Sequence, residues 1–124
     1  MLTLLLIEPH AALRRSLQQW LETELAGGTV LAVSEPAQAL KLAAVEPPCV
    51  MLIDLDMIEP TELTCVLRLG QFCGCALIGV GLDDTTAHRQ RAQLMGIPNF
   101  VGKAQLQTDL IPLIHHLLDR TTLV

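Results

Sequence analysis

The sequence contains almost no aromatic residues. Trp20, Phe72 and Phe100 are the only ones among 124 residues, although 51% of the chain is apolar. That apolar content excludes an intrinsically disordered chain and is sufficient for a core. Because the core must consist of Leu, Ile, Val and Ala, we expect a buried parallel sheet with helices on both faces. The length predicts one domain, residues 1–124.

Basic residues are also scarce and scattered. The chain has 8 Lys and Arg against 13 Asp and Glu, which gives a formal net charge of −5. A nucleic-acid surface needs clustered Lys and Arg to displace counterions, so we expect no direct binding of nucleic acid. The expected partners are proteins, or a cation at a local acidic site.

Long apolar runs and targeting signals are missing as well. The apolar start, residues 1–7, is short, has no basic segment before it and ends at Glu8-Pro9-His10 without a small-residue cleavage site, unlike a signal peptide. No run approaches the ~18 apolar residues of a membrane span. We therefore expect a soluble, cytoplasmic protein without a membrane segment.

Four cysteines are present, but their spacing indicates neither a zinc site nor a disulfide framework. Cys73 and Cys75 are separated by one residue, unlike the ligands of a zinc knuckle, and no His follows at ligand spacing. Cys49 lies in a strand-like apolar run and Cys65 in a helix-like one. We expect buried free thiols, because Cys behaves as a small apolar residue.

Apolar periodicity predicts five strands that alternate with five helices. The strands are expected at Thr3–Ile7, Thr29–Val33, Val50–Ile53, Ala76–Val80 and Asn99–Val101. The helices are expected near 13–25, 35–44, 62–69, Thr85–Met95 and Thr108–Asp119, with Ser34 and Thr61 as the N-caps of the second and third. Strands without polar alternation are covered on both faces, so the expected fold is α/β with a doubly wound parallel sheet.

Charged residues follow three of these strands at the edge where an open parallel sheet binds its ligands. Glu8 follows the first strand, Asp54 the third and Lys103 the fifth. Carboxylates at neighbouring strand ends can hold a hard cation such as Mg²⁺, and a lysine can neutralise a carboxylate or a phosphoryl group on it. The combination predicts a functional site, whereas each residue alone is more often a turn, cap or surface residue.

The four histidines add little to this prediction. His10 is a candidate ligand, but a surface histidine beside a helix start is the more frequent role. His88, His115 and His116 lie on expected helices, at solvated or interface positions.

In order and spacing these residues resemble the receiver domain of bacterial two-component response regulators, a CheY-like domain, from Leu2 to about Leu118. The segments that carry the resemblance are residues 4–15, 50–57 and 92–103. The resemblance implies a flavodoxin-like arrangement of five strands and five helices, with strand order 2-1-3-4-5.

The resemblance also implies a role for each residue of the site. Asp54 would accept a phosphoryl group, and Lys103 would contact the phosphate. Glu8, Asp54 and the backbone carbonyl of Asp56 would bind Mg²⁺. Phe100 would be the aromatic residue that moves on activation.

The sequence departs from the family's pattern at several positions. Pro9 replaces the second acid of the pair, and because proline has no side-chain oxygen, Mg²⁺ is expected to bind more weakly. Gly81 stands at the switch position, where a hydroxyl residue would couple the phosphate to Phe100. Ile58, Glu62 and Ala104 are further departures.

Three interpretations of the function follow. In the first, a sensor histidine kinase or a small phosphodonor phosphorylates Asp54, with His10 or water completing the metal shell. In the second, the protein is a phosphorylation-independent pseudo-receiver that serves as an interaction or dimerisation module. The third, a flavodoxin-like ligand binder or small enzyme, is disfavoured because no glycine-rich phosphate loop follows the first strand.

The first interpretation describes a signalling protein and not an enzyme. Its partner surface is expected between the fourth and fifth helices, with His115 and His116 included, and a homodimer through the same face is an open alternative. Because no DNA-binding segment follows Val124, we expect the output to act through another protein.

Overall fold

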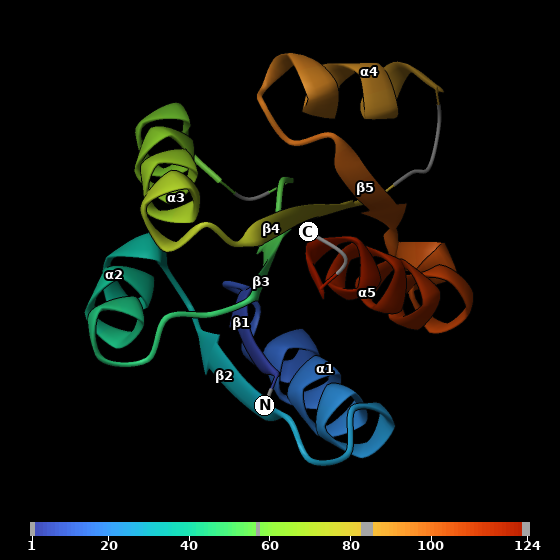
Figure 1. The fold of residues 1–124 in the computed structure, drawn as a ribbon. Helices are drawn as coiled ribbons and strands as arrows, with labels where there is room; N and C mark the ends of the chain where they lie inside the picture. Colours follow the sequence, from blue (N-terminus) through green and yellow to red (C-terminus); the bar gives the residue numbers. More distant parts are fainter. Residues whose placement is uncertain (1, 57, 83–85, 123–124) are drawn as a thin grey trace.

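A five-stranded parallel sheet forms the centre of the structure (Figure 1). The computed structural model describes residues 2–56, 58–82 and 86–122. The strands are β1 (Thr3–Ile7), β2 (Thr29–Val33), β3 (Val50–Asp54), β4 (Ala76–Gly81) and β5 (Asn99–Gly102). Their order is β2-β1-β3-β4-β5 and every pair is parallel, which confirms the predicted fold class and strand order.

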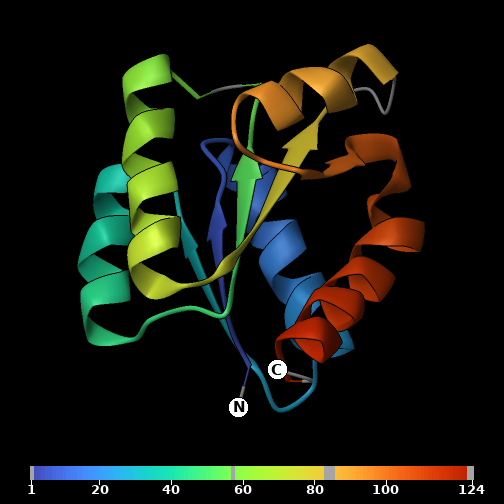
Figure 2. The same ribbon diagram turned by 45° about the horizontal axis from the view of Figure 1, so that its top comes forward.

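Helices cover both faces of the sheet (Figures 1 and 2). α1 (Ala11–Glu24) and α5 (Leu106–Thr122) pack on one face, and α2 (Pro36–Val45) and α3 (Pro60–Cys73) pack on the other. α4 (Thr86–Leu94) lies against β5, and a short 3₁₀ turn, η1 (Lys103–Gln105), precedes α5. Within the described residues, no helix has the length and apolar content that crossing a membrane requires.

Alternating side chains divide the core into two apolar layers. In β3, Val50 and Leu52 pack toward α1 and α5, whereas Met51 and Ile53 pack toward α2 and α3. Every residue of β1 and β3 is buried. This burial on both faces is the reason that these strands consist of unbroken apolar runs.

Three strands extend further at the carboxyl edge than the sequence predicts. Asp54 and Gly81, expected in loops, are the last residues of β3 and β4, and β5 continues to Gly102. In the sheet, Asp54 lies opposite Val80 and Gly81 opposite Gly102. Asp54 is therefore held by the central strand and not by a loop.

Two predicted N-caps are wrong. α2 begins at Pro36 and not directly after Ser34, and α3 begins at Pro60 and not after Thr61. In both helices proline occupies the first turn. A backbone N–H at that position has no partner within the helix, so proline loses no hydrogen bond there, and its fixed φ suits a helix. In α3 a capping box formed by two glutamates replaces the predicted threonine cap.

The last helix begins earlier than predicted. α5 starts at Leu106 and not at Thr108, because Leu106 is buried in the core and its docking orders the first turn. The predicted start of α4 at Thr85 lies outside the described residues.

The cysteines are free, as predicted, but none is fully buried. Cys49 is exposed, and Cys65, Cys73 and Cys75 are partly buried. The prediction of burial is wrong for Cys49 because this residue precedes β3, at the amino edge of the sheet, and is not part of the strand itself.

Candidate functional site

Two buried carboxyl groups lie side by side at the carboxyl edge of the sheet. Glu8 directly follows β1 and is 1% exposed, and Asp54 ends β3 and is 5% exposed. Ile7 pairs with Ile53 across the two strands, so the two acids are the next residues in register. Among the described residues, Thr3 is the only other polar side chain with so little exposure. The structure thus brings together two acids that the sequence places far apart.

Glu8 is in an environment that favours its neutral form. Its Oε2 accepts the backbone N–H of His10 at 3.1 Å. Burial, followed by a side-chain hydrogen bond with Asp54, raises the pKa of Glu8 to about 7. The negative charge of Asp54 adds to this effect, while the His10 N–H and the positive charge of Lys103 oppose it. Glu8 therefore titrates close to neutral pH.

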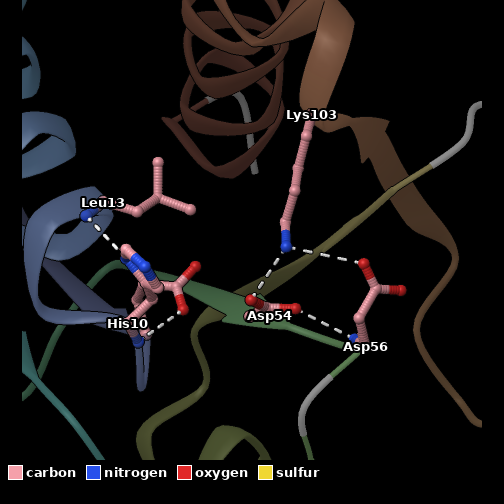
Figure 3. A network of polar contacts seen from close by, with 6 residues as sticks. His10, Leu13, Asp54, Asp56 and Lys103 are labelled. Atoms are coloured by element: carbon pink, nitrogen blue, oxygen red, sulfur yellow. Dashed lines mark hydrogen bonds and ion pairs between the residues drawn. The ribbon is translucent and has the colours of Figure 1, made fainter.

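The Asp54 carboxylate uses both of its oxygens (Figure 3). Oδ1 accepts the backbone N–H of Asp56 at 2.9 Å, and Oδ2 accepts a hydrogen bond from Lys103 Nζ at 3.1 Å. Lys103 Nζ also lies 3.5 Å from Asp56 Oδ2. One lysine thus joins an acid at the end of β3 to a second acid in the loop that follows.

Lys103 remains charged in this setting. Its side chain is 25% exposed. Partial burial lowers the pKa of Lys103, but the hydrogen bond to Asp54 and the negative charges of Asp54, Asp56 and Glu8 outweigh this effect, so its pKa lies above the ordinary value. The predicted convergence of Glu8, Asp54 and Lys103 is present, and the Asp56 carboxylate belongs to the same group.

His10 has a structural role at the start of α1. Its Nδ1 accepts the backbone N–H of Leu13 at 3.2 Å, which makes it the N-cap of the helix (Figure 3). An imidazole nitrogen that accepts this bond has no lone pair left for a metal. The structure thus shows the more frequent of the two roles that the sequence left open for His10.

Phe100 packs directly on Gly81. The Phe100 side chain in β5 is buried, and a Cβ built on Gly81 would lie 2.7 Å from its Cζ and 2.8 Å from its Cε2. Such distances are shorter than real Cβ contacts. The ring therefore occupies the space that any side chain at position 81 would need.

The site offers few ligands to a cation. Among the described residues, no three His, Cys, Asp or Glu side chains are arranged to hold a metal ion. Glu8 and Asp54 remain as adjacent carboxylates, and Pro9 supplies no oxygen. Because Mg²⁺ is often held by one or two carboxylates with phosphate oxygens and water, these two residues fit a weak magnesium site.

The pocket beside Asp54 is very small. It has a volume of about 20 Å³ and is lined in part by Pro9, Ser34 and Ile58. Pockets for small molecules usually measure about 300–1,000 Å³. The space beside Asp54 is therefore too small for a nucleotide, which argues against a nucleotide site at these acids.

We expect the raised pKa of Glu8 to make folding stability depend on pH. Between its ordinary value of 4.5 and about 7, the unfolded chain has lost the Glu8 proton while the folded protein keeps it. Stability therefore falls as pH rises through this window, by up to about 3 kcal/mol, and this contribution is constant above it. Urea unfolding of the wild type and of Glu8→Gln at several pH values measures the effect as the difference between the two curves. A pH-independent difference would contradict the expectation.

Known structures share this fold, although no family model and no curated protein matches the sequence. The signal receiver domain of a DNA-binding response regulator from Colwellia psychrerythraea 34H is 21% identical, with a TM-score of 0.80 over 96% of this chain and 99% of that one. A response regulator receiver domain protein from Clostridium thermocellum is 17% identical, with a TM-score of 0.80 over 99% and 98%. A DNA-binding response regulator of the LuxR family from Staphylococcus aureus is 19% identical, with a TM-score of 0.74 over 94% and 98%.

The chain therefore has the CheY-like fold of response-regulator receiver domains. At these identities the likeness concerns the fold, and the function must be argued from the site itself.

Proposed function

We propose that this protein is a signalling receiver that accepts a phosphoryl group on Asp54. The observation that carries the proposal is the position of Asp54, a carboxylate 5% exposed at the carboxyl end of the central strand, with Lys103 Nζ 3.1 Å from its Oδ2. A buried nucleophile beside a fixed cation is suited to receive a group that carries negative charge. The neighbouring pocket is too small for a metabolite.

In the proposed reaction, a carboxylate oxygen of Asp54 attacks the phosphorus of a phosphohistidine or of a small acyl phosphate. The bond from phosphorus to its former carrier breaks, and an aspartyl phosphate forms. Lys103 moves from the Asp54 oxygen to the oxygens of the phosphoryl group and compensates their charge. Mg²⁺ held by Glu8, Asp54 and the Asp56 carbonyl would supply further charge neutralisation during transfer.

The proposed output is a change in protein contacts. The surface formed by α4, β5 and α5 is the proposed docking face, with a cytoplasmic histidine kinase or another signalling protein as the partner. His115 and His116 are exposed on α5, and Leu94 at the end of α4 is 90% exposed. Homodimerisation through this face is the alternative.

Phosphorylation is tested by the intact mass of the protein after incubation with acetyl phosphate and Mg²⁺. We expect one phosphoryl group on the wild type and none on Asp54→Asn. Asp56→Asn is the matched control, because it removes the neighbouring acid but leaves the proposed acceptor, and it should still gain one group. An adduct on Asp54→Asn, or none on the wild type with a phosphorylated kinase as donor, would contradict the proposal.

The phosphorylation-independent pseudo-receiver is the second candidate, and the site itself provides the argument for it. Pro9 leaves only Glu8 and Asp54 as adjacent acids, and Gly81 offers no hydroxyl to a phosphoryl group. The Phe100 ring already fills the space above Gly81. A protein in this state would present one fixed surface to its partner. The mass experiment separates the two candidates, because only the first gives an adduct that depends on Asp54.

A further inference from the structure

Three thiols gather at the amino edge of the sheet, opposite the acidic site. Cys49 immediately precedes β3, Cys75 immediately precedes β4, and Cys73 is the last residue of α3. Val50 and Ala76, the first residues of the two strands, pair in register. The N–H of Ala76 donates to the carbonyl of Cys49 at 3.0 Å. The strand pairing thus continues one step back and places Cys49 beside Cys75.

The Cys49 thiol contributes to the raised pKa of Cys75, so the two side chains are near each other. Cys49 lies one residue before β3, and continuing the side-chain alternation of that strand back by one residue puts it on the face of Met51 and Ile53. These two residues belong to the core layer under α2 and α3, and Cys75 packs against the same layer. Neighbouring strands lie about 4.8 Å apart, within the range of about 4.4–6.8 Å that Cα atoms joined by a disulfide span.

The surroundings give the two thiols different properties. Cys49 is exposed and open to reagents in solution, whereas Cys75 is partly buried. Burial raises the pKa of Cys75 to about 11, and the nearby thiols of Cys73 and then Cys49 contribute to the shift. A thiol with a raised pKa reacts slowly with external reagents, so Cys49 is the point of entry for an oxidant.

We propose that Cys49 and Cys75 form a reversible disulfide, with glutathione disulfide as the oxidant. The Cys49 thiolate attacks one sulfur of glutathione disulfide, whose S–S bond breaks and releases one glutathione thiolate. The Cys75 thiolate then attacks the Cys49 sulfur of the mixed disulfide and releases the second glutathione. The two thiol protons and two electrons pass to glutathione, so that one protein disulfide and two reduced glutathiones result.

This bond would connect β3 to β4 and close a loop that contains the whole of α3. Closing a loop of this kind reduces the freedom of the unfolded chain and thereby stabilises the folded one. β3 ends in Asp54 and β4 in Gly81, so oxidation would stiffen the strand that carries the proposed acceptor and the strand beside it. A metal role for the thiols is less consistent with the structure, because the described residues show no three-ligand group with suitable geometry.

The experiment uses the full chain, reduced and then incubated with glutathione disulfide, with intact mass and thiol alkylation as readouts. We expect the wild type to lose two free thiols without retaining glutathione, and its melting temperature to rise by several degrees in a way that dithiothreitol reverses. The double variant Cys65→Ser/Cys73→Ser keeps only Cys49 and Cys75 and should behave identically. This double variant lacks two cysteines but retains both reacting residues. It therefore distinguishes the effect of the Cys49–Cys75 disulfide from a general effect of removing cysteines.

Single variants identify the order of the steps. Cys75→Ser should stop at one glutathione per chain, bound to Cys49. Cys49→Ser should no longer react rapidly with glutathione disulfide. Retention of glutathione on the double variant, or loss of the disulfide in Cys73→Ser alone, would overturn the proposed pairing. None of these readouts depends on Asp54, so the result is independent of the proposed phosphorylation.

Discussion

Replacing Gly81 by alanine is expected to destabilise the protein by about 1–3 kcal/mol, the usual range for an overpacked core. The new Cβ would lie 2.7 Å from Cζ of Phe100, whose ring is buried and 5% exposed, so either the ring or β4 must shift. Urea unfolding of the wild type and Gly81→Ala measures the loss. Amide hydrogen exchange across β5 should show whether the ring leaves its place.

A double-mutant cycle makes this expectation specific. If the clash with the ring is the cause, Gly81→Ala should have little effect in a Phe100→Leu background, where the aromatic edge is gone. Gly79→Ala is the matched control in the same strand, because its Cβ would meet Leu55 and Ile97 and not Phe100. Its effect should be the same in both backgrounds. Equal losses for Gly81→Ala with and without the Phe100 ring would show that the contact is not the cause.

The packing of Phe100 on Gly81 also bears on function. The resemblance to receiver domains implied a hydroxyl residue at position 81 and a mobile aromatic residue at position 100. Here the glycine lets the Phe100 ring pack against the backbone of β4, and a larger residue would exclude it. Gly81→Thr would therefore restore the hydroxyl only by displacing the ring. The residues at positions 81 and 100 therefore constrain each other by their volume as well as by their chemistry.

The fold could be predicted from the sequence because both faces of the sheet are buried. Strands such as β1 and β3 are apolar at every position, so a short run of Leu, Ile and Val is enough to recognise them. The same signal fails at strand ends. Asp54 and Gly81 continue β3 and β4 through backbone hydrogen bonds, which do not require an apolar side chain and leave no trace in hydropathy.

The site could be predicted in part, for a related reason. The ends of parallel strands meet at one edge, so Glu8, Asp54 and Lys103 were expected to converge, and they do. The Asp56 carboxylate beside Lys103 was missed, because its direction depends on the conformation of the loop after β3. The role of His10 as an N-cap was one of two open possibilities, and only the 3.2 Å contact with Leu13 decides between them.

Replacing Lys103 by methionine is expected to destabilise the protein by about 2–4 kcal/mol at pH 8. Removing one partner of a fully buried ion pair usually costs about 3–5 kcal/mol, and the partial exposure of Lys103 reduces this. Methionine keeps most of the apolar stem, so the change removes mainly the charge that compensates Asp54. At pH 8 Glu8 is ionised as well, because its pKa is about 7, and the uncompensated negative charge is then greatest.

The dependence on charge gives two further expected results. At pH 5.5, where Glu8 holds its proton, Lys103→Met should destabilise the protein less, since one of the negative charges beside Asp54 is gone. Combining Lys103→Met with Asp54→Asn should recover most of the stability, because the buried charge is removed together with its partner. Lys41→Met, on the exposed side of α2, is the control and should change stability by less than about 0.5 kcal/mol. If Lys103→Met instead unfolds at the same urea concentration as the wild type at both pH values, then Lys103 does not compensate the buried acids. In that case the site would not hold its cation ready for a phosphoryl group.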